Sequence, residues 1–174
     1  MKLLNLGCGG SRPKDEHWIN IDNLYDLFID KNRPERIQLE SEPNYLNHDL
    51  RGGIPFEENS IDGILMSHFL EHLDIHQSVS IIKESNRVLK KGGVLRIISP
   101  DPRKFYDKTI MGDNNWGEPN YRPNITFMEY ALFFYMHKQI ISVDSLACML
   151  YLGGFKEYQL SDYKQSNIPE LLEL

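Results

Sequence analysis

A glycine-rich turn and an acid follow the first two apolar runs of this sequence. Gly7-Cys8-Gly9-Gly10 stops the run Leu3–Leu6, a pattern typical of a buried strand that ends in a tight turn. Glycines there let the backbone approach a ligand closely, and Asp22, which ends the second run, could accept hydrogen bonds from both hydroxyls of a ribose. Arg12 stands where the pattern G-x-G-x-x-G requires its third glycine. A glycine-rich surface turn with a capping Asp22 therefore remains an alternative interpretation of these features alone.

Histidines and acids that could move a proton form a second group. His68 and His72 are one turn apart if their segment is helical, and Glu71 lies between them. They resemble a metal cluster, but the H-E-x-x-H order is absent and the sequence identifies no third ligand, so no metal is predicted. The candidate general bases are His68, Glu71, His72, Asp101 and His137. We expect a structural hydrogen bond for His72 and select His68, Asp101 and His137 as candidate catalytic residues; a plain turn residue is the alternative for Asp101.

Short apolar runs alternate with helical periodicity, which favours parallel strands joined by helices. The predicted strands are 3–6, 18–22, a short one from Tyr45, 61–67, 94–98 and 155–160, and the predicted helices begin at Asp74 and Ser142. This order predicts an α/β fold, a Rossmann-like doubly wound, mostly parallel sheet of six or seven strands with helices on both faces, shortened at both termini. Only Gly10–His17, with Pro13 among them, separate the glycine turn from the second strand, so the first crossover helix must be short or distorted.

Several motifs resemble, in the same order, those of class I S-adenosylmethionine-dependent methyltransferases of the small-molecule group. They are L-N-L-G-C-G (4–9), Asp22, D-L (49–50), the loop 50–62, S-H-F-L-E-H-L (67–73) and N-R-V-L-K-K-G-G-V-L (86–95). The resemblance implies S-adenosylmethionine as the cofactor, with the backbone of 6–9 at the methionine moiety and Asp22 at the ribose. It also implies Asp49 and Leu50 at the adenine, and Ser67 and His68 beside the methyl donor. The cofactor-binding residues that it implies are Leu6, Gly7, Cys8, Gly9, Asp22, Asp49, Leu50, Ser67 and His68.

A narrower resemblance concerns predicted bacterial methyltransferases associated with surface-polysaccharide synthesis. It rests on W-I-N-I-D (18–22), His137-Lys138 and S-N-I-P-E-L (166–171). The two resemblances imply methyl transfer to a small-molecule or sugar acceptor, with an oxygen acceptor favoured. A catalytically inactive S-adenosylmethionine-binding partner subunit is the alternative. A nicotinamide-dependent oxidoreductase is less consistent with the sequence, because it would require a fuller glycine fingerprint and a longer first crossover.

Length and composition set the remaining expectations. The 174 residues suit one domain, 1–174, and a formal charge of −6 argues against a nucleic-acid partner, because phosphate binding needs clustered Lys and Arg. Residues 103–141 are predicted to be a substrate-side insertion, whose aromatic stripe 127–135 would pack in the core, cover the acceptor or form a homodimer face. The sequence shows neither a signal peptide nor an apolar span, so we expect a cytoplasmic chain. Cys8 is expected to be a small packing residue and Cys148 a core residue.

Overall fold

The computed structural model describes residues 1–23, 42–103, 132, 136–161 and 171. The strands are β1 (Leu3–Leu6), β2 (Trp18–Asp22), β3 (Tyr45–Asn47), β4 (Ile61–Ser67) and β5 (Leu89–Ile98). The helices are α2 (Ile75–Val88) and α5 (Val143–Leu152), with single 3₁₀ turns η1 (Leu50–Gly52) and η2 (Leu70–His72). No helix among these residues combines the length and the apolar character needed to cross a membrane.

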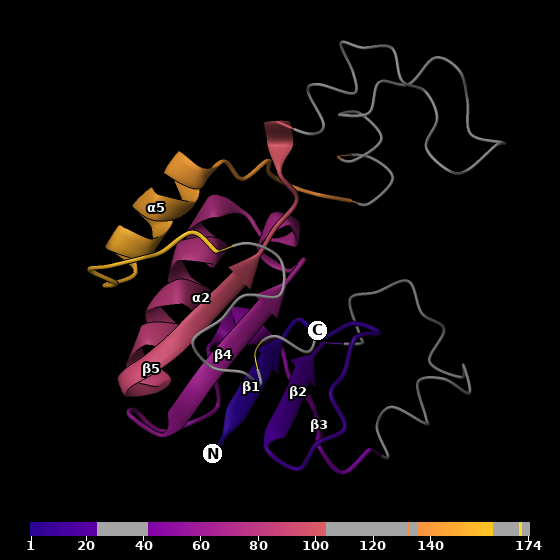
Figure 1. Ribbon diagram of the computed structural model, residues 1–174. Coiled ribbons are helices and arrows are strands. Elements are labelled where there is room, and N and C mark those ends of the chain that lie inside the picture. Colours follow the sequence, from indigo (N-terminus) through magenta and orange to yellow (C-terminus); the bar gives the residue numbers. More distant parts are fainter. Residues whose placement is uncertain (24–41, 104–131, 133–135, 162–170, 172–174) are drawn as a thin grey trace, which may run out of the picture.

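The strands form one sheet in the order β3-β2-β1-β4-β5, and every neighbouring pair is parallel (Figure 1). Leu6 lies opposite Ile21 on one side and Met66 on the other, so β1, β2 and β4 end at the same edge of the sheet. The strand order reverses between β1 and β4, and ligands of such sheets bind outside the strand ends at this switch point. The predicted Rossmann-like parallel sheet is confirmed.

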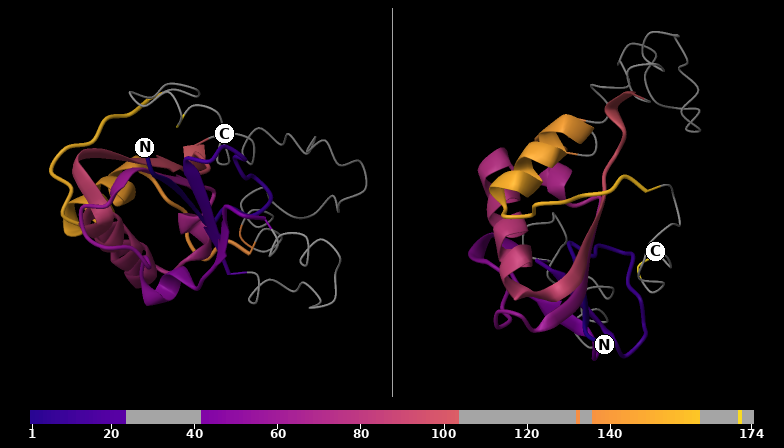
Figure 2. Two further views of the ribbon diagram at one scale, coloured as in Figure 1. Left: turned by 90° about the horizontal axis from the view of Figure 1, so that it is seen from below. Right: turned by 60° about the vertical axis from the view of Figure 1, so that its left-hand side comes forward.

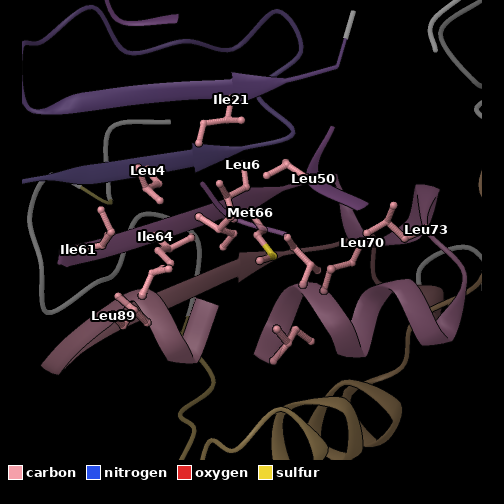
Figure 3. Close-up of a cluster of buried hydrophobic side chains, with 14 of the residues drawn as sticks. Leu4, Leu6, Ile21, Leu50, Ile61, Ile64, Met66, Leu70, Leu73 and Leu89 are labelled. Carbon is pink, nitrogen blue, oxygen red and sulfur yellow. The ribbon is translucent and has the colours of Figure 1, made fainter. Parts of the chain in front are cut away.

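One face of the sheet carries the larger core. Leu4, Leu6, Ile64 and Met66 are fully buried there (Figure 3), and each such side chain contributes about 1.5–3 kcal/mol relative to an exposed one. Helix α2 packs on this face, and α5 packs on α2 (Figures 1 and 2). The ends of these helices follow the sequence signals: Asp74 and Gln77 cap α2 reciprocally, and Ser142 caps α5.

The opposite face is closed by polar side chains where β1 connects to β2. Residues 7–17 contain no helix, which confirms the expected short or distorted crossover. Asn5 and Asn20, 2% and 0% exposed, are paired across β1 and β2, and the amide of Asn5 donates to Asn20 Oδ1 (3.0 Å) and to the carbonyl of Ser11 (2.8 Å). Asn20 Nδ2 donates to the carbonyl of Pro13 (3.0 Å). These bonds hold the connection against the sheet, and among the described residues both α-helices lie on the other face.

Three local predictions are wrong. Residues 155–160 form no strand, and Tyr158 and Leu160 stay 58% and 67% exposed, because no strand in the described part of the chain pairs with the segment. The strand predicted at 94–98 begins earlier: helix α2 ends at Val88 and β5 begins at Leu89, so Lys90–Gly93 belong to an irregular part of that strand. Cys148 is exposed, since α5 turns Met149 inward instead. The sheet therefore has five strands within the described residues, and most of 103–141, including the aromatic stripe, lies outside them.

Candidate functional site

The glycine turn after β1 is held against the end of β2. Gly7 and Gly9 have φ angles of +67° and +48°, a region that L-residues rarely adopt. The amides of Gly7 and Cys8 donate to the carbonyl of Ile21 at 2.9 and 3.3 Å. A Cβ on Gly9 would meet no atom within 4 Å, whereas one on Gly7 would collide with the ring of Phe69, which follows β4. The turn thus presents bare backbone to open space on one side and packs across the switch point on the other.

Asp22 ends β2 with its carboxylate turned toward this turn. Its Oδ2 accepts a hydrogen bond from the amide of Gly9 at 2.7 Å, and its Oδ1 accepts one from Asn23 at 2.7 Å. A carboxylate offers about four lone-pair sites, so each oxygen retains acceptor capacity for a ligand hydroxyl. The sequence-predicted pair of glycine turn and acid is therefore brought together at the carboxyl edge of the sheet.

Cys8 lies inside the same turn, and its thiol does not face solvent. The side chain is 5% exposed, and burial together with the nearby Asp22 carboxylate raises the pKa of Cys8 to about 12. Because the thiolate is the reactive form, this environment suppresses nucleophilic chemistry at Cys8. It favours the predicted role of a small packing residue.

Asp49 and Leu50 follow β3 at the same edge, but both have partners within the protein. Asp49 caps η1, and Arg51 donates to its two oxygens through Nε at 2.8 and 3.1 Å and through Nη2 at 2.7 Å. The hydrogen bonds from Arg51 lower the pKa of Asp49, which stays an acceptor near neutral pH. Leu50 is only 7% exposed and packs into the core beside Leu6 and Ile21 (Figure 3).

The end of β4 carries the most unusual backbone of the site. His68 follows Ser67 directly and has a φ of +52°, while its amide donates to the carbonyl of Ile98 on β5 at 2.9 Å. Its side chain is 61% exposed, and Nδ1 lies 3.1 Å from Oε1 of Glu71, whose side chain is 2% exposed. The hydrogen bond to Glu71 raises the pKa of His68. Strained backbone of this kind gathers at functional sites, where surrounding contacts maintain it.

His137 reaches the same cluster from a distant part of the sequence. The amide of Lys138 donates to the carbonyl of Glu71 at 2.7 Å, and Gln139 Nε2 donates to the carbonyls of Leu70 and Leu73 at 2.9 and 3.0 Å. These bonds to carbonyls of η2 and of Leu73 hold the segment in place. The ring of His137 stands edge-on to that of His72, with centroids 4.9 Å apart. Burial lowers the pKa of His137, which keeps its ring neutral at pH 7.

The structure thus places the predicted residues in separate groups. Asp22 lies beside the glycine turn, and His68, Glu71, His72 and His137 form one cluster beyond β4. Asp101 follows β5 and pairs with Arg103, whose Nη2 lies 2.9 Å from its Oδ2.

Sequence reasoning missed Phe69 and Gln139, which position the turn and the cluster respectively. No local pattern signals either residue. Their roles depend on contacts between segments that are far apart in the chain.

A family model described as a methyltransferase domain matches residues 4–97, which run from within β1 into β5 and include the glycine turn, Asp22 and the Ser67–His72 segment. The chain belongs to this methyltransferase family. The match confirms the predicted family, and it covers the strands whose ends carry the candidate site. No curated protein matches the chain significantly.

Solved structures of low sequence identity share the fold. A SAM-dependent methyltransferase from Archaeoglobus fulgidus is 20% identical with a TM-score of 0.55, and the match covers 90% of this chain and 61% of that one. One from Thermotoga maritima is 18% identical with a TM-score of 0.53, and the match covers 90% of this chain and 64% of that one. One from Methanosarcina mazei is 16% identical with a TM-score of 0.52, and the match covers 87% of this chain and 78% of that one. The methyltransferase-domain chain thus spans about three fifths of the length of the first two.

Proposed function

We propose that this chain is an S-adenosylmethionine-dependent methyltransferase that methylates a hydroxyl of a small molecule or a sugar. One observation supports the cofactor most directly: the Gly9 amide binds the Asp22 carboxylate at 2.7 Å, with open space beside Gly9, at the switch point of the sheet. The backbone at Gly9 has no side chain to obstruct a ligand, and each Asp22 oxygen can accept a further hydrogen bond. This arrangement suits a nucleoside with two ribose hydroxyls. The family match to residues 4–97 supports the same cofactor.

The residues at this edge fit the group. When bound, S-adenosylmethionine supplies an electrophilic methyl group on a sulfonium sulfur. The backbone of Leu6–Gly9 would hold the methionine end, and Asp22 would accept from the ribose with its remaining lone pairs. Asp49 would accept from the adenine amino group while sharing its oxygens with Arg51, and Leu50 would offer the ring its exposed edge. Ser67 and His68 would border the methyl donor.

His68 is the general base of this proposal. Its exposed ring follows β4 at the carboxyl edge, and Glu71 holds Nδ1, which leaves Nε2 as the nitrogen that takes the proton of an acceptor hydroxyl. Asp101 and His137 are the other candidate bases; Asp101 pairs with Arg103, and His137 contacts His72. Acceptor specificity would come from the insertion 103–141.

The test of the cofactor site is calorimetric titration with S-adenosylhomocysteine. Asp22→Ala should abolish measurable binding, and Asp22→Asn, which keeps an oxygen for the Gly9 amide, should weaken it by roughly tenfold or more, because hydrogen bonds to a charged partner are the stronger ones. Asp144→Ala, an exposed acid in the first turn of α5, is the matched control and should bind like the wild type. Unchanged affinity in Asp22→Ala would reject the assignment.

Turnover is tested separately with the wild-type chain. Transfer of a labelled methyl group to members of a panel of hydroxyl acceptors, including sugars, would support the enzyme. Tight binding of S-adenosylhomocysteine without turnover on any acceptor would favour a cofactor-binding partner subunit instead.

A further inference from the structure

The cluster beyond β4 contains a donor set that metal ions prefer. In the described part of the chain, Glu71, His72 and His137 each offer one ligand atom, and these atoms all lie within 4.8 Å of one another. Two imidazole nitrogens and one carboxylate oxygen are the three protein ligands of many catalytic zinc sites. The sequence identifies His72 and Glu71 but not the third ligand, and the fold supplies it as His137.

The buried carboxylate of Glu71 is the second, independent observation. The residue is 1% exposed, and its Oε1 is engaged by His68. Its Oε2 is also shielded from solvent and has no hydrogen-bond partner among the described residues. Buried carboxylate oxygens are almost always satisfied, so this one points to a partner that the described protein atoms do not supply, and a cation is such a partner.

The surrounding contacts prepare the three side chains for a shared ligand. The Lys138 amide and the Gln139 side chain, which follow His137 directly, fix the backbone beside it against η2, which carries Glu71 and His72. Gln139 Nε2 also donates to Ser78 Oγ at 2.7 Å, which ties the segment to α2. Ligand atoms on a tetrahedral zinc ion lie about 3.4 Å apart, so no pair has to approach by more than about 1.4 Å.

We propose that Glu71, His72 and His137 bind a divalent transition-metal ion of the zinc class, with Glu71 Oε2 as the carboxylate ligand. His68, which contacts the other oxygen of Glu71, acts as a positioning residue for that carboxylate. Three protein ligands leave a coordination position open, as in sites that bind a water molecule or a substrate oxygen. The proposal rests on these side chains alone and holds whether or not methyl transfer is the activity of the chain.

The experiment is titration of the metal-free full chain with Zn²⁺ by calorimetry and with Co²⁺ by visible absorption. A Cys148→Ser background removes an exposed thiol that could hold zinc by itself. We expect one ion per chain, with a Co²⁺ spectrum typical of four or five nitrogen and oxygen ligands. His137→Gln and Glu71→Gln should each weaken binding by at least about tenfold, the minimum that even outer-shell changes at metal sites cost. His76→Gln, an exposed histidine on α2, should leave the affinity unchanged.

Two further measurements, circular dichroism and anomalous scattering, distinguish a lost metal site from a misfolded variant. Circular dichroism establishes that each variant is folded, and His137→Gln changes only a half-buried side chain. Anomalous scattering from zinc-soaked crystals of the unmutated chain should give a peak between Glu71, His72 and His137. The proposal is overturned if zinc fails to bind, if the peak lies elsewhere, or if His137→Gln and His76→Gln bind zinc equally well.

Discussion

Replacing Gly7 by alanine tests whether the glycine turn and the end of β4 are packed as described. At a φ of +67°, an alanine costs about 1–2 kcal/mol of left-handed strain. The alanine Cβ would also collide with the ring of Phe69 and would lie 2.9 Å from the Phe69 Cβ, which does not move when the ring rotates. The resulting overpacking adds about 1–3 kcal/mol, so Gly7→Ala should destabilise the fold by about 2–5 kcal/mol.

Gly9→Ala is the matched control for this experiment. Gly9 has a similar φ of +48°, but a Cβ there meets no atom within 4 Å, so only the strain of about 1–2 kcal/mol applies. The two variants should therefore differ by about 2 kcal/mol, which is about 6 °C in Tm for a chain of this length. Urea unfolding followed by circular dichroism measures the difference, provided that the slope m stays constant.

A double variant shows whether Phe69 causes the difference. In Gly7→Ala/Phe69→Ala the ring no longer collides with the new methyl group, so the loss should be smaller than the sum of the single losses by about 1 kcal/mol or more. The reasoning is refuted if Gly7→Ala and Gly9→Ala are equally destabilised. Strict additivity in the double variant would refute it as well.

Three further predictions concern other contacts. A thiol reagent at pH 8 should label Cys148 rapidly and Cys8 only after unfolding, because burial raises the pKa of Cys8 to about 12; equal labelling rates would contradict this. Arg87 lowers the pKa of Glu84 below its ordinary 4.5, so this pair stabilises the fold above that pH and the contribution is lost as the pH falls further. Glu84→Gln should thus cost about 1 kcal/mol in urea at pH 7 and little in acid; a cost independent of pH would exclude the ion pair as its source. Gln139→Leu removes the side-chain donor to the carbonyls of Leu70 and Leu73 and to the hydroxyl of Ser78, although the Leu70 carbonyl keeps the Leu73 amide as a donor. It should cost about 2 kcal/mol in the same assay, and a neutral result would argue against the described contact.

The elements that depend on local signals could be predicted from the sequence. The apolar run ending at Gly7 and the cap formed by Asp74 and Gln77 act within a few residues, and both appear as predicted. The pairing of the glycine turn with Asp22 could also be predicted, because parallel strands that are adjacent in sequence end at one edge. Residues 155–160 carry a comparable local pattern but form no strand, because a strand requires a neighbour to satisfy its backbone.

By itself, the sequence determined the family, the parallel sheet and the position of the candidate cofactor site, because strand order and turn chemistry are encoded in short motifs. Only the tertiary structure decided which distant side chains meet. His137 joins Glu71 and His72 through hydrogen bonds of the residues that follow it, and Phe69 closes against Gly7 across the switch point. Such contacts arise when the folded chain brings remote segments together, and no pattern within a short window of sequence records them.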